Sequence, residues 1–244
     1  MRFGILVPIF IGIRPAFIQL FHMELSITLI IIIVTTLVSI GGFSNPKIID
    51  DLIFYPPAVT QQRQWWRFFT CGFIHADFGH LILNMFVLYL FGRNVEKAFV
   101  DIFGRNGSIL YLVMYISALV VCLLPTFKKH RNNYYYRSLG ASGAVSAVVF
   151  ARILFDPITG LGLFFIPIYI AGFLFAIIYL LFSYWLDKKG ADNINHSAHI
   201  FGALYGVAFT IIASKIFSDF PLLTYFIDSI KNMSPGQIIQ FGSY

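Results

Sequence analysis

Residues 198–206 read Ala-His-Ile-Phe-Gly-Ala-Leu-Tyr-Gly. In a helix, His199, Gly202 and Gly206 lie on one face, because they are three and then four residues apart. Two glycines at this spacing leave the face without side chains, so that a second helix can approach closely. His199 then lies between two helices. Such a histidine either forms a structural hydrogen bond between the helices or acts as a base.

The segment Gly140-Ala141-Ser142-Gly143 is the candidate for the facing helix. Its small residues leave the backbone around Ser142 uncrowded at the start of an apolar stretch. The free N–H groups and the positive dipole end of a helix N-terminus favour an oxyanion. Small-residue packing between helices is the alternative interpretation, because Ser142 and Ser146 are four residues apart.

A close contact between these two helices would bring the imidazole of His199 to the hydroxyl of Ser142. That pairing is the minimum for an activated serine nucleophile. His196, three residues earlier, is the alternative base, although we expect it to lie in the preceding loop. The sequence offers no evident third acid to orient His199, so we predict a Ser–His dyad rather than a triad.

His80 and Asn84 are four residues apart and therefore point the same way from a helix. Both side chains donate hydrogen bonds, so next to Ser142 they would stabilise the negative oxygen of a tetrahedral intermediate. The alternative is a hydrogen bond between helices, worth about 0.6 kcal/mol on average. For His75, five residues before His80, we expect a structural role.

The composition indicates an integral membrane protein. Hydrophobic residues make up 58% of the 244 residues and charged residues 11%, and the mean hydropathy is +0.79. Soluble domains carry about 25% charged residues, so this chain cannot cover a water-facing surface. The composition excludes cytoplasmic enzymes and nucleic-acid binders. The net charge of +6 suits anionic lipid headgroups. Two cysteines, Cys71 and Cys122, give no disulfide framework and no zinc ribbon.

Apolar stretches bounded by Gly, Pro and charged residues predict an all-α bundle of six transmembrane helices with short connections. A long loop, 43–78, separates the first two. The predicted spans are 25–40, 79–92, 108–124, 140–155, a helix within 161–186, and 198–214.

The flanks are predicted to lie outside this bundle. Residues 1–22 are apolar but interrupted by Pro and Gly, and we interpret them as an N-terminal extension or an interfacial segment. Residues 23–214 form the membrane domain. Residues 215–244 form a partly amphipathic tail at the membrane surface. Lys and Arg divide almost evenly between the two sets of loops, so charge alone does not orient the chain.

Two other intramembrane protease chemistries do not fit the sequence. A zinc protease of this kind needs His-Glu-x-x-His, whereas His75 and His80 are five residues apart with no glutamate between them. An aspartyl protease needs two helical aspartates, and the predicted spans carry no paired carboxylates. We therefore predict neither a metal site nor a cofactor.

Taken in order, these motifs resemble the rhomboid intramembrane serine proteases, in their compact six-helix bacterial form. The resemblance covers roughly residues 25–214. It rests on Trp66-Arg67-Phe68-Phe69-Thr70, His75, His80, Asn84, Gly140-Ala141-Ser142-Gly143 and the stretch 198–206.

The resemblance implies a role for each motif. Ser142 would be the nucleophile and His199 the general base, while His80 and Asn84 would help to form the oxyanion hole. Trp66 and Arg67 would belong to a long loop in the outer leaflet. The pairs Gly140 with Gly143, and Gly202 with Gly206, would allow close helix packing.

The resemblance also implies an orientation and a substrate class. The N-terminus would be cytoplasmic and the site would open outward, in a bacterial inner membrane. Residues 187–195 would cap the site, and the fifth helix would border substrate access. The partners would be the lipid bilayer and transmembrane protein substrates, with no nucleic acid and no metal.

One position departs from the family pattern. Many bacterial relatives carry a tyrosine four residues after the serine, stacked on the catalytic histidine, whereas this chain has Ser146. Support for His199 must then come from another residue. Two alternative functions remain. One is a non-catalytic rhomboid-like protein that binds membrane clients; the other is a small transporter, which the lack of repeats and paired interrupted helices disfavours.

Overall fold

The computed structural model describes residues 26–162, 168–190 and 194–241. The predicted N-terminal extension, 1–22, lies outside the described residues. The described chain is mostly helical. Its longer helices are α2 (Ile27–Ser44), α6 (Phe78–Phe103), α7 (Gly107–Val121), α9 (Ser142–Phe155), α10 (Gly172–Lys189) and α11 (His196–Phe217).

Shorter elements connect and flank these helices. They are α3 (Pro46–Leu52), α4 (Pro56–Gln62), α5 (Arg67–Thr70), η1 (Cys71–Phe73), η2 (Gly104–Asn106), α8 (Leu124–His130), β1 (Gly160–Gly162), β2 (Ile168–Ala171), α12 (Leu222–Lys231), η3 (Pro235–Gln237) and β3 (Ile239–Phe241).

Three stretches of the described chain are long and apolar enough to cross a bilayer: Ile27–Ser44, Phe78–His130 and His196–Phe217. The second contains both α6 and α7, which turn at η2 and pack against each other. Helix α9 is apolar but shorter, and α10 ends in Asp187, Lys188 and Lys189. The protein is therefore a helical membrane protein.

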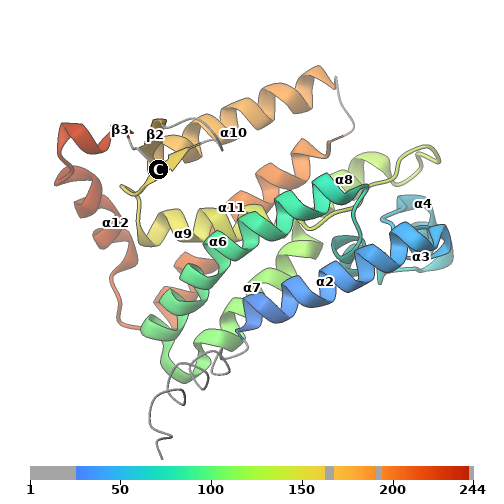
Figure 1. Cartoon of the computed structure of the whole chain (residues 1–244), viewed down its shortest axis with the longest axis horizontal. Coiled ribbons are helices and arrows are strands. Elements are labelled where there is room, and N and C mark those ends of the chain that lie inside the picture. Colours follow the sequence, from blue (N-terminus) through green and yellow to red (C-terminus); the bar gives the residue numbers. More distant parts are fainter. Residues whose placement is uncertain (1–25, 163–167, 191–193, 242–244) are drawn as a thin grey trace, which may run out of the picture.

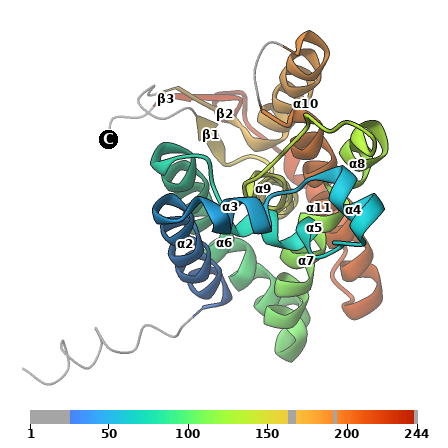
Figure 2. The same cartoon turned by 90° about the vertical axis from the view of Figure 1, so that its right-hand side faces the viewer.

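Helix α9 occupies the centre of the bundle, where Figure 2 shows it nearly end-on with the other long helices around it. It packs against α6, α7, α10, α11 and α12. Most of its side chains are buried, and many are small, which suits a helix surrounded by others. Figure 1 shows α3, α4 and α8 at one end of the bundle and the β-strands and α12 toward the other.

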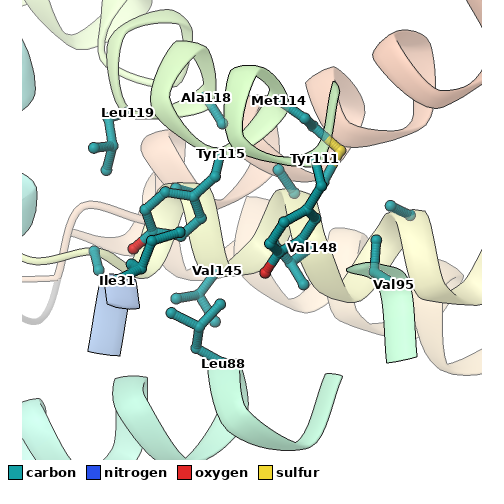
Figure 3. Close-up of a cluster of buried hydrophobic side chains, with 14 of the residues drawn as sticks. Ile31, Leu88, Val95, Tyr111, Met114, Tyr115, Ala118, Leu119, Val145 and Val148 are labelled. Carbon is teal, nitrogen blue, oxygen red and sulfur yellow. The ribbon is translucent and has the colours of Figure 1, made fainter. Parts of the chain in front are cut away.

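The largest side chains of the core come from α7. Tyr111 and Tyr115 are fully buried, and Figure 3 shows their rings among Leu88 of α6, Val145 and Val148 of α9 and neighbouring apolar side chains. The hydroxyl of Tyr111 is satisfied by Thr28 Oγ1 at 3.0 Å. This cluster fixes α9, and therefore Ser142 at its first position, against α6 and α7.

Three regions differ from the sequence-based expectation. The predicted fifth span begins as a helix only at Gly172, after the short strands β1 and β2, which the sequence did not indicate. The C-terminal tail returns to the bundle: α12 packs against α9, and β3 pairs antiparallel with β2, with Tyr169 opposite Gln240. The predicted loop 43–78 contains three short helices and a 3₁₀ turn.

The start of α2 is held by a carboxylate from another helix. Glu96 of α6 accepts hydrogen bonds from the backbone N–H groups of Ile27 at 2.7 Å and Thr28 at 3.0 Å, and from Thr28 Oγ1 at 2.8 Å. These N–H groups have no partner within their own helix, and the negative charge also suits the positive end of the dipole. Thr28 and Glu96 are both buried, so Glu96 links α2 to α6 inside the protein.

Replacing Glu96 by alanine is expected to lower the free energy of unfolding by about 3 kcal/mol, because buried donors lose their acceptor. Unfolding by SDS titration in mixed micelles measures this change. Lys97→Ala is the matched control, since its exposed ion pair with Asp101 contributes at most about 1 kcal/mol. Equal effects of the two substitutions would refute the capping role.

Candidate active site

The site is centred on a hydrogen bond between Ser142 and His199. The Nε2 atom of His199 lies 2.7 Å from the Oγ atom of Ser142. Ser142 is the first residue of α9, and His199 lies in the first turn of α11. Residues 57 positions apart in the chain thus meet at the starts of two packed helices. The distance suits proton transfer from a hydroxyl to an imidazole.

Backbone contact between α9 and α11 brings the pair together. A Cβ atom on Gly202 would overlap the carbonyl oxygen of Gly143 and lie 2.8 Å from its carbonyl carbon. A Cβ atom on Gly206 would lie 2.6 Å from the Cα atom of Ala147. The two helices therefore touch through glycines, as the Gly202-x-x-x-Gly206 spacing predicted.

The turn before Ser142 depends on Gly140. Its φ is +111°, a region that side chains rarely adopt, and its N–H donates to the carbonyl oxygen of Cys71 at 2.8 Å. A Cβ atom here would lie 2.7 Å from Cε1 of His80. The imidazole of His80 therefore lies directly against the turn that leads into Ser142.

Asn84 lies one turn further along α6 than His80. Its Nδ2 atom donates to the carbonyl oxygen of His80 at 2.9 Å, and the residue is buried. At the start of the helix, the Asp77 carboxylate accepts from the N–H of His80 at 2.8 Å. The structure thus places His80 beside the turn before Ser142, with the Asn84 side chain bonded to the backbone of α6.

Trp66 is the N-cap of α5, and Arg67 is the first residue of this short helix. Arg67 is buried, and its Nη1 atom donates to the carbonyl oxygens of Asp50 at 2.8 Å and Ile53 at 2.7 Å. Its Nε atom donates to Gln64. The Trp66 side chain is half exposed. Arg67 therefore holds together the segment between α2 and α6.

The alternative base, His196, is buried at the first position of α11 rather than in a loop. Its ring lies edge-on to that of His199, with the centroids 5.9 Å apart. Asn195 caps this helix by accepting from the N–H of Ala198 at 3.1 Å. His199 is the histidine that contacts the serine, and His196 contacts His199.

A tyrosine from α10 reaches Ser146. The hydroxyl groups of Tyr179 and Ser146 are 3.0 Å apart, one turn below Ser142. Phe150 and Phe175 flank the tyrosine ring, with centroids at 5.5 and 6.1 Å. Helix α10 therefore places the ring and hydroxyl of Tyr179 beside this part of α9. No spacing in the sequence links positions 146 and 179, so sequence reasoning missed this pair.

The Ser146–Tyr179 bond is expected to contribute about 1 kcal/mol to the free energy of unfolding, because Ser146 is buried and Tyr179 is partly buried. Ser146→Ala and Tyr179→Phe each remove it, so the double variant is expected to lose about 1 kcal/mol less than the sum of the two. SDS unfolding of all four proteins measures this coupling. Strict additivity would show that the bond contributes nothing.

Within residues 26–162, 168–190 and 194–241, no three His, Cys, Asp or Glu side chains are placed to hold a metal ion. Cys71 and Cys122 are buried as free thiols. Cys122 packs against the start of α9, because a Cβ atom on Gly143 would be 2.5 Å from its Sγ atom. The chemistry available at the site is that of a serine hydroxyl, an imidazole and backbone N–H groups.

Comparison with known proteins relates this arrangement to a family. The model of the Rhomboid domain matches residues 62–216, which contain Ser142, His199, His80 and Asn84. RHOMBOID-like protein 12, mitochondrial, of Arabidopsis thaliana is 32% identical over 55% of this chain and 42% of its own length. Rhomboid protease GluP of Bacillus subtilis is 27% identical over 68% of this chain and 29% of its own.

A further relative is presenilin-associated rhomboid-like protein A, mitochondrial, of Danio rerio. It is 28% identical over 68% of this chain and 42% of its own length. The chain therefore spans less than half the length of these curated relatives.

Proposed function

Because this chain belongs to the rhomboid family, we propose that it is an intramembrane serine endopeptidase that cleaves transmembrane segments of membrane proteins. Ser142 is the nucleophile and His199 the general base. The 2.7 Å contact between Ser142 Oγ and His199 Nε2 carries the proposal. The name of the Bacillus subtilis relative, a rhomboid protease, supports it.

The proposed reaction uses the pair twice. In the first step, Nε2 of His199 takes the hydroxyl proton while Oγ of Ser142 attacks the peptide carbonyl carbon. His199 then gives this proton to the leaving amine, which leaves an acyl-enzyme. In the second step, His199 takes a proton from water, which attacks the ester carbonyl carbon, and then returns this proton to Oγ of Ser142 as the acid product leaves. No cofactor takes part.

The start of α9 supports stabilisation of the oxyanion. The N–H of Ser142 lies in the first turn of this helix, where no intrahelical acceptor is available. The ring of His80, packed against Gly140, provides a second donor from the side of α6. Asn84 joins this group if its amide turns away from the carbonyl oxygen of His80.

We propose a membrane arrangement with six spans, formed by α2, α6, α7, α9, α10 and α11 within residues 23–214. The N-terminus is cytoplasmic and the site opens toward the outer face, with Trp66 and Arg67 in the outer-leaflet loop. The bacterial inner membrane is the proposed location; the mitochondrial names of two relatives provide the alternative membrane.

Cleavage in proteoliposomes tests this function. The substrate is a reporter protein with one transmembrane segment that carries Gly and Pro near its outer end, where unwinding exposes the peptide bond. Wild-type protein is expected to cut the reporter within that segment, and Ser142→Ala is expected to leave the reporter intact. Mass spectrometry of the products locates the cut.

The client-binding function is favoured by a single observation, which is that several relatives are named rhomboid-like. Wild-type protein that captures the reporter without cutting it would support that function and refute the protease. The Ser142–His199 contact supports the protease, since client binding alone requires neither residue.

A further inference from the structure

His75 is a buried histidine to which the proposed reaction gives no role. It lies between η1 and α6, and its side chain is 1% exposed. Its Nδ1 atom is 3.0 Å from Oγ of Ser39 on α2, and this same hydroxyl donates to the carbonyl oxygen of Phe73 at 3.0 Å. Because Ser39 has one hydroxyl proton and donates it to Phe73, the Nδ1–H group of His75 is the donor to Ser39 Oγ.

The second ring nitrogen faces the nucleophile turn. The backbone N–H of Ala141, the residue before Ser142, donates to Nε2 of His75 at 3.4 Å. An acceptor at Nε2 and a donor at Nδ1 define one neutral tautomer. This one tautomer is compatible with three hydrogen bonds at once: Ser39 to Phe73, His75 to Ser39, and Ala141 to His75.

The surroundings of His75 keep the ring neutral. Burial lowers its pKa to about 4, and His80 acts in the same direction while Asp77 opposes it. At neutral pH the ring therefore carries no second proton that would repel the N–H of Ala141. The lone pair on Nε2 stays available to the turn.

The same ring also contacts the candidate oxyanion donor. The rings of His75 and His80 meet edge to face, with centroids 4.9 Å apart, and His80 lies against Gly140. One side chain thus touches both the residue before the nucleophile and the imidazole beside it. The N–H of Gly140 is tied to the same segment through the carbonyl oxygen of Cys71.

We propose that His75 is a positioning residue, which fixes the turn before Ser142 through its neutral Nε2 atom and fixes the ring of His80 through edge-to-face contact. This proposal rests on the proposed function of Ser142. His75 touches no substrate. It acts by holding Ala141, and therefore Oγ of Ser142 and the N–H groups at the start of α9, in the reactive position relative to His199.

Two substitutions of His75 distinguish the contribution of its Nε2 atom from that of its Nδ1 atom. His75→Asn retains a polar atom near Nδ1 and removes the acceptor near Nε2, whereas His75→Gln places its amide oxygen near Nε2 and gives up the contact with Ser39. The rate of serine labelling by a fluorophosphonate probe is measured for both, well below their melting temperatures. We expect His75→Gln to stay within about threefold of wild type and His75→Asn to lose tenfold or more, since small misplacement of reacting groups is costly.

A merely structural role predicts a different pattern. In that case the two variants would lose labelling equally and in step with their melting temperatures, and this result overturns the proposal. Labelling of His75→Asn at the wild-type rate also overturns it. Ser39→Ala is the control: it removes the partner of Nδ1 and leaves the acceptor, so it is expected to follow His75→Gln.

A second measurement uses only wild-type protein, so it tests the proposal even where the variants do not fold. Nitrogen-15 NMR of histidine-labelled wild-type protein reports which ring nitrogen carries the proton. We expect His75 to carry it on Nδ1 at neutral pH; a proton on Nε2 refutes the proposal. Wild-type protein that fails to label, but shows the Nδ1–H tautomer, would refute the proposed protease function and leave the geometry of His75 intact.

Discussion

Replacing His199 by alanine is expected to lower the rate of reporter cleavage by about 10³-fold or more, because Ser142 loses the group that accepts its proton. The fold is expected to persist, since the contact between α9 and α11 is made by Gly202 and Gly206 rather than by the imidazole. Single-turnover cleavage in proteoliposomes, with the melting temperature measured in parallel, separates loss of chemistry from loss of folding.

His196→Ala is the matched control for this prediction. His196 lies one turn before His199 and contacts its ring, whereas the hydrogen bond to Ser142 is made by His199. We expect this variant to retain cleavage within about tenfold of wild type, which corresponds to about 1.4 kcal/mol of transition-state stabilisation. The reverse result, cleavage retained in His199→Ala and lost in His196→Ala, would assign the base to His196.

Replacing Gly202 by valine is expected to prevent folding or to lower the free energy of unfolding by more than about 4 kcal/mol. A Cβ atom at this position overlaps backbone atoms of Gly143, which cannot move aside as a flexible side chain would. Helix α11 must then move away from α9, which also separates His199 from Ser142. SDS unfolding and fluorophosphonate labelling of the same preparation measure both effects.

Gly236→Ala is the control for glycine substitution as such. No heavy atom lies within 4 Å of a Cβ atom at this position, in the 3₁₀ turn η3, so stability is expected to change by less than about 0.5 kcal/mol. A Gly202→Val protein with wild-type stability and labelling would show that the two helices are not in backbone contact.

The sequence predicted the helices because length and apolarity determine them locally. The predicted spans 25–40, 140–155 and 198–214 correspond to α2, α9 and α11, with ends that differ by a few residues. Helix α6 extends well beyond its predicted end at 92, to Phe103, because Arg93 and Lys97 are exposed on the helix surface and do not interrupt it.

The meeting of Ser142 and His199 was also predictable, because small residues at helical spacing specify which faces touch. Contacts that no such spacing marks could not be predicted from the sequence. Glu96 caps a helix that starts 69 residues earlier, and β2 pairs with a strand about 70 residues later. A strand of three or four residues shows no alternation, and a single buried carboxylate does not reveal its partner. Such contacts depend on the tertiary arrangement alone.

The departure at Ser146 illustrates the same limit. The sequence showed that the usual tyrosine is absent from α9, and it gave no indication of where a replacement lies. The structure places Tyr179 beside Ser146 from α10, through an arrangement that depends on how two helices pack. His75 is a similar case, since its two nitrogens acquire opposite roles only when α2 and the turn before α9 meet around it.

The site of fluorophosphonate attachment tests most directly whether Ser142 is an activated nucleophile. Purified wild-type protein in detergent is treated with the probe, digested and analysed by mass spectrometry, beside Ser142→Ala. We expect one modified peptide in the wild type, which carries the adduct on Ser142, and none in the variant. A folded wild-type protein without an adduct, or with the adduct on another serine, would contradict the claim that Ser142 is an activated nucleophile.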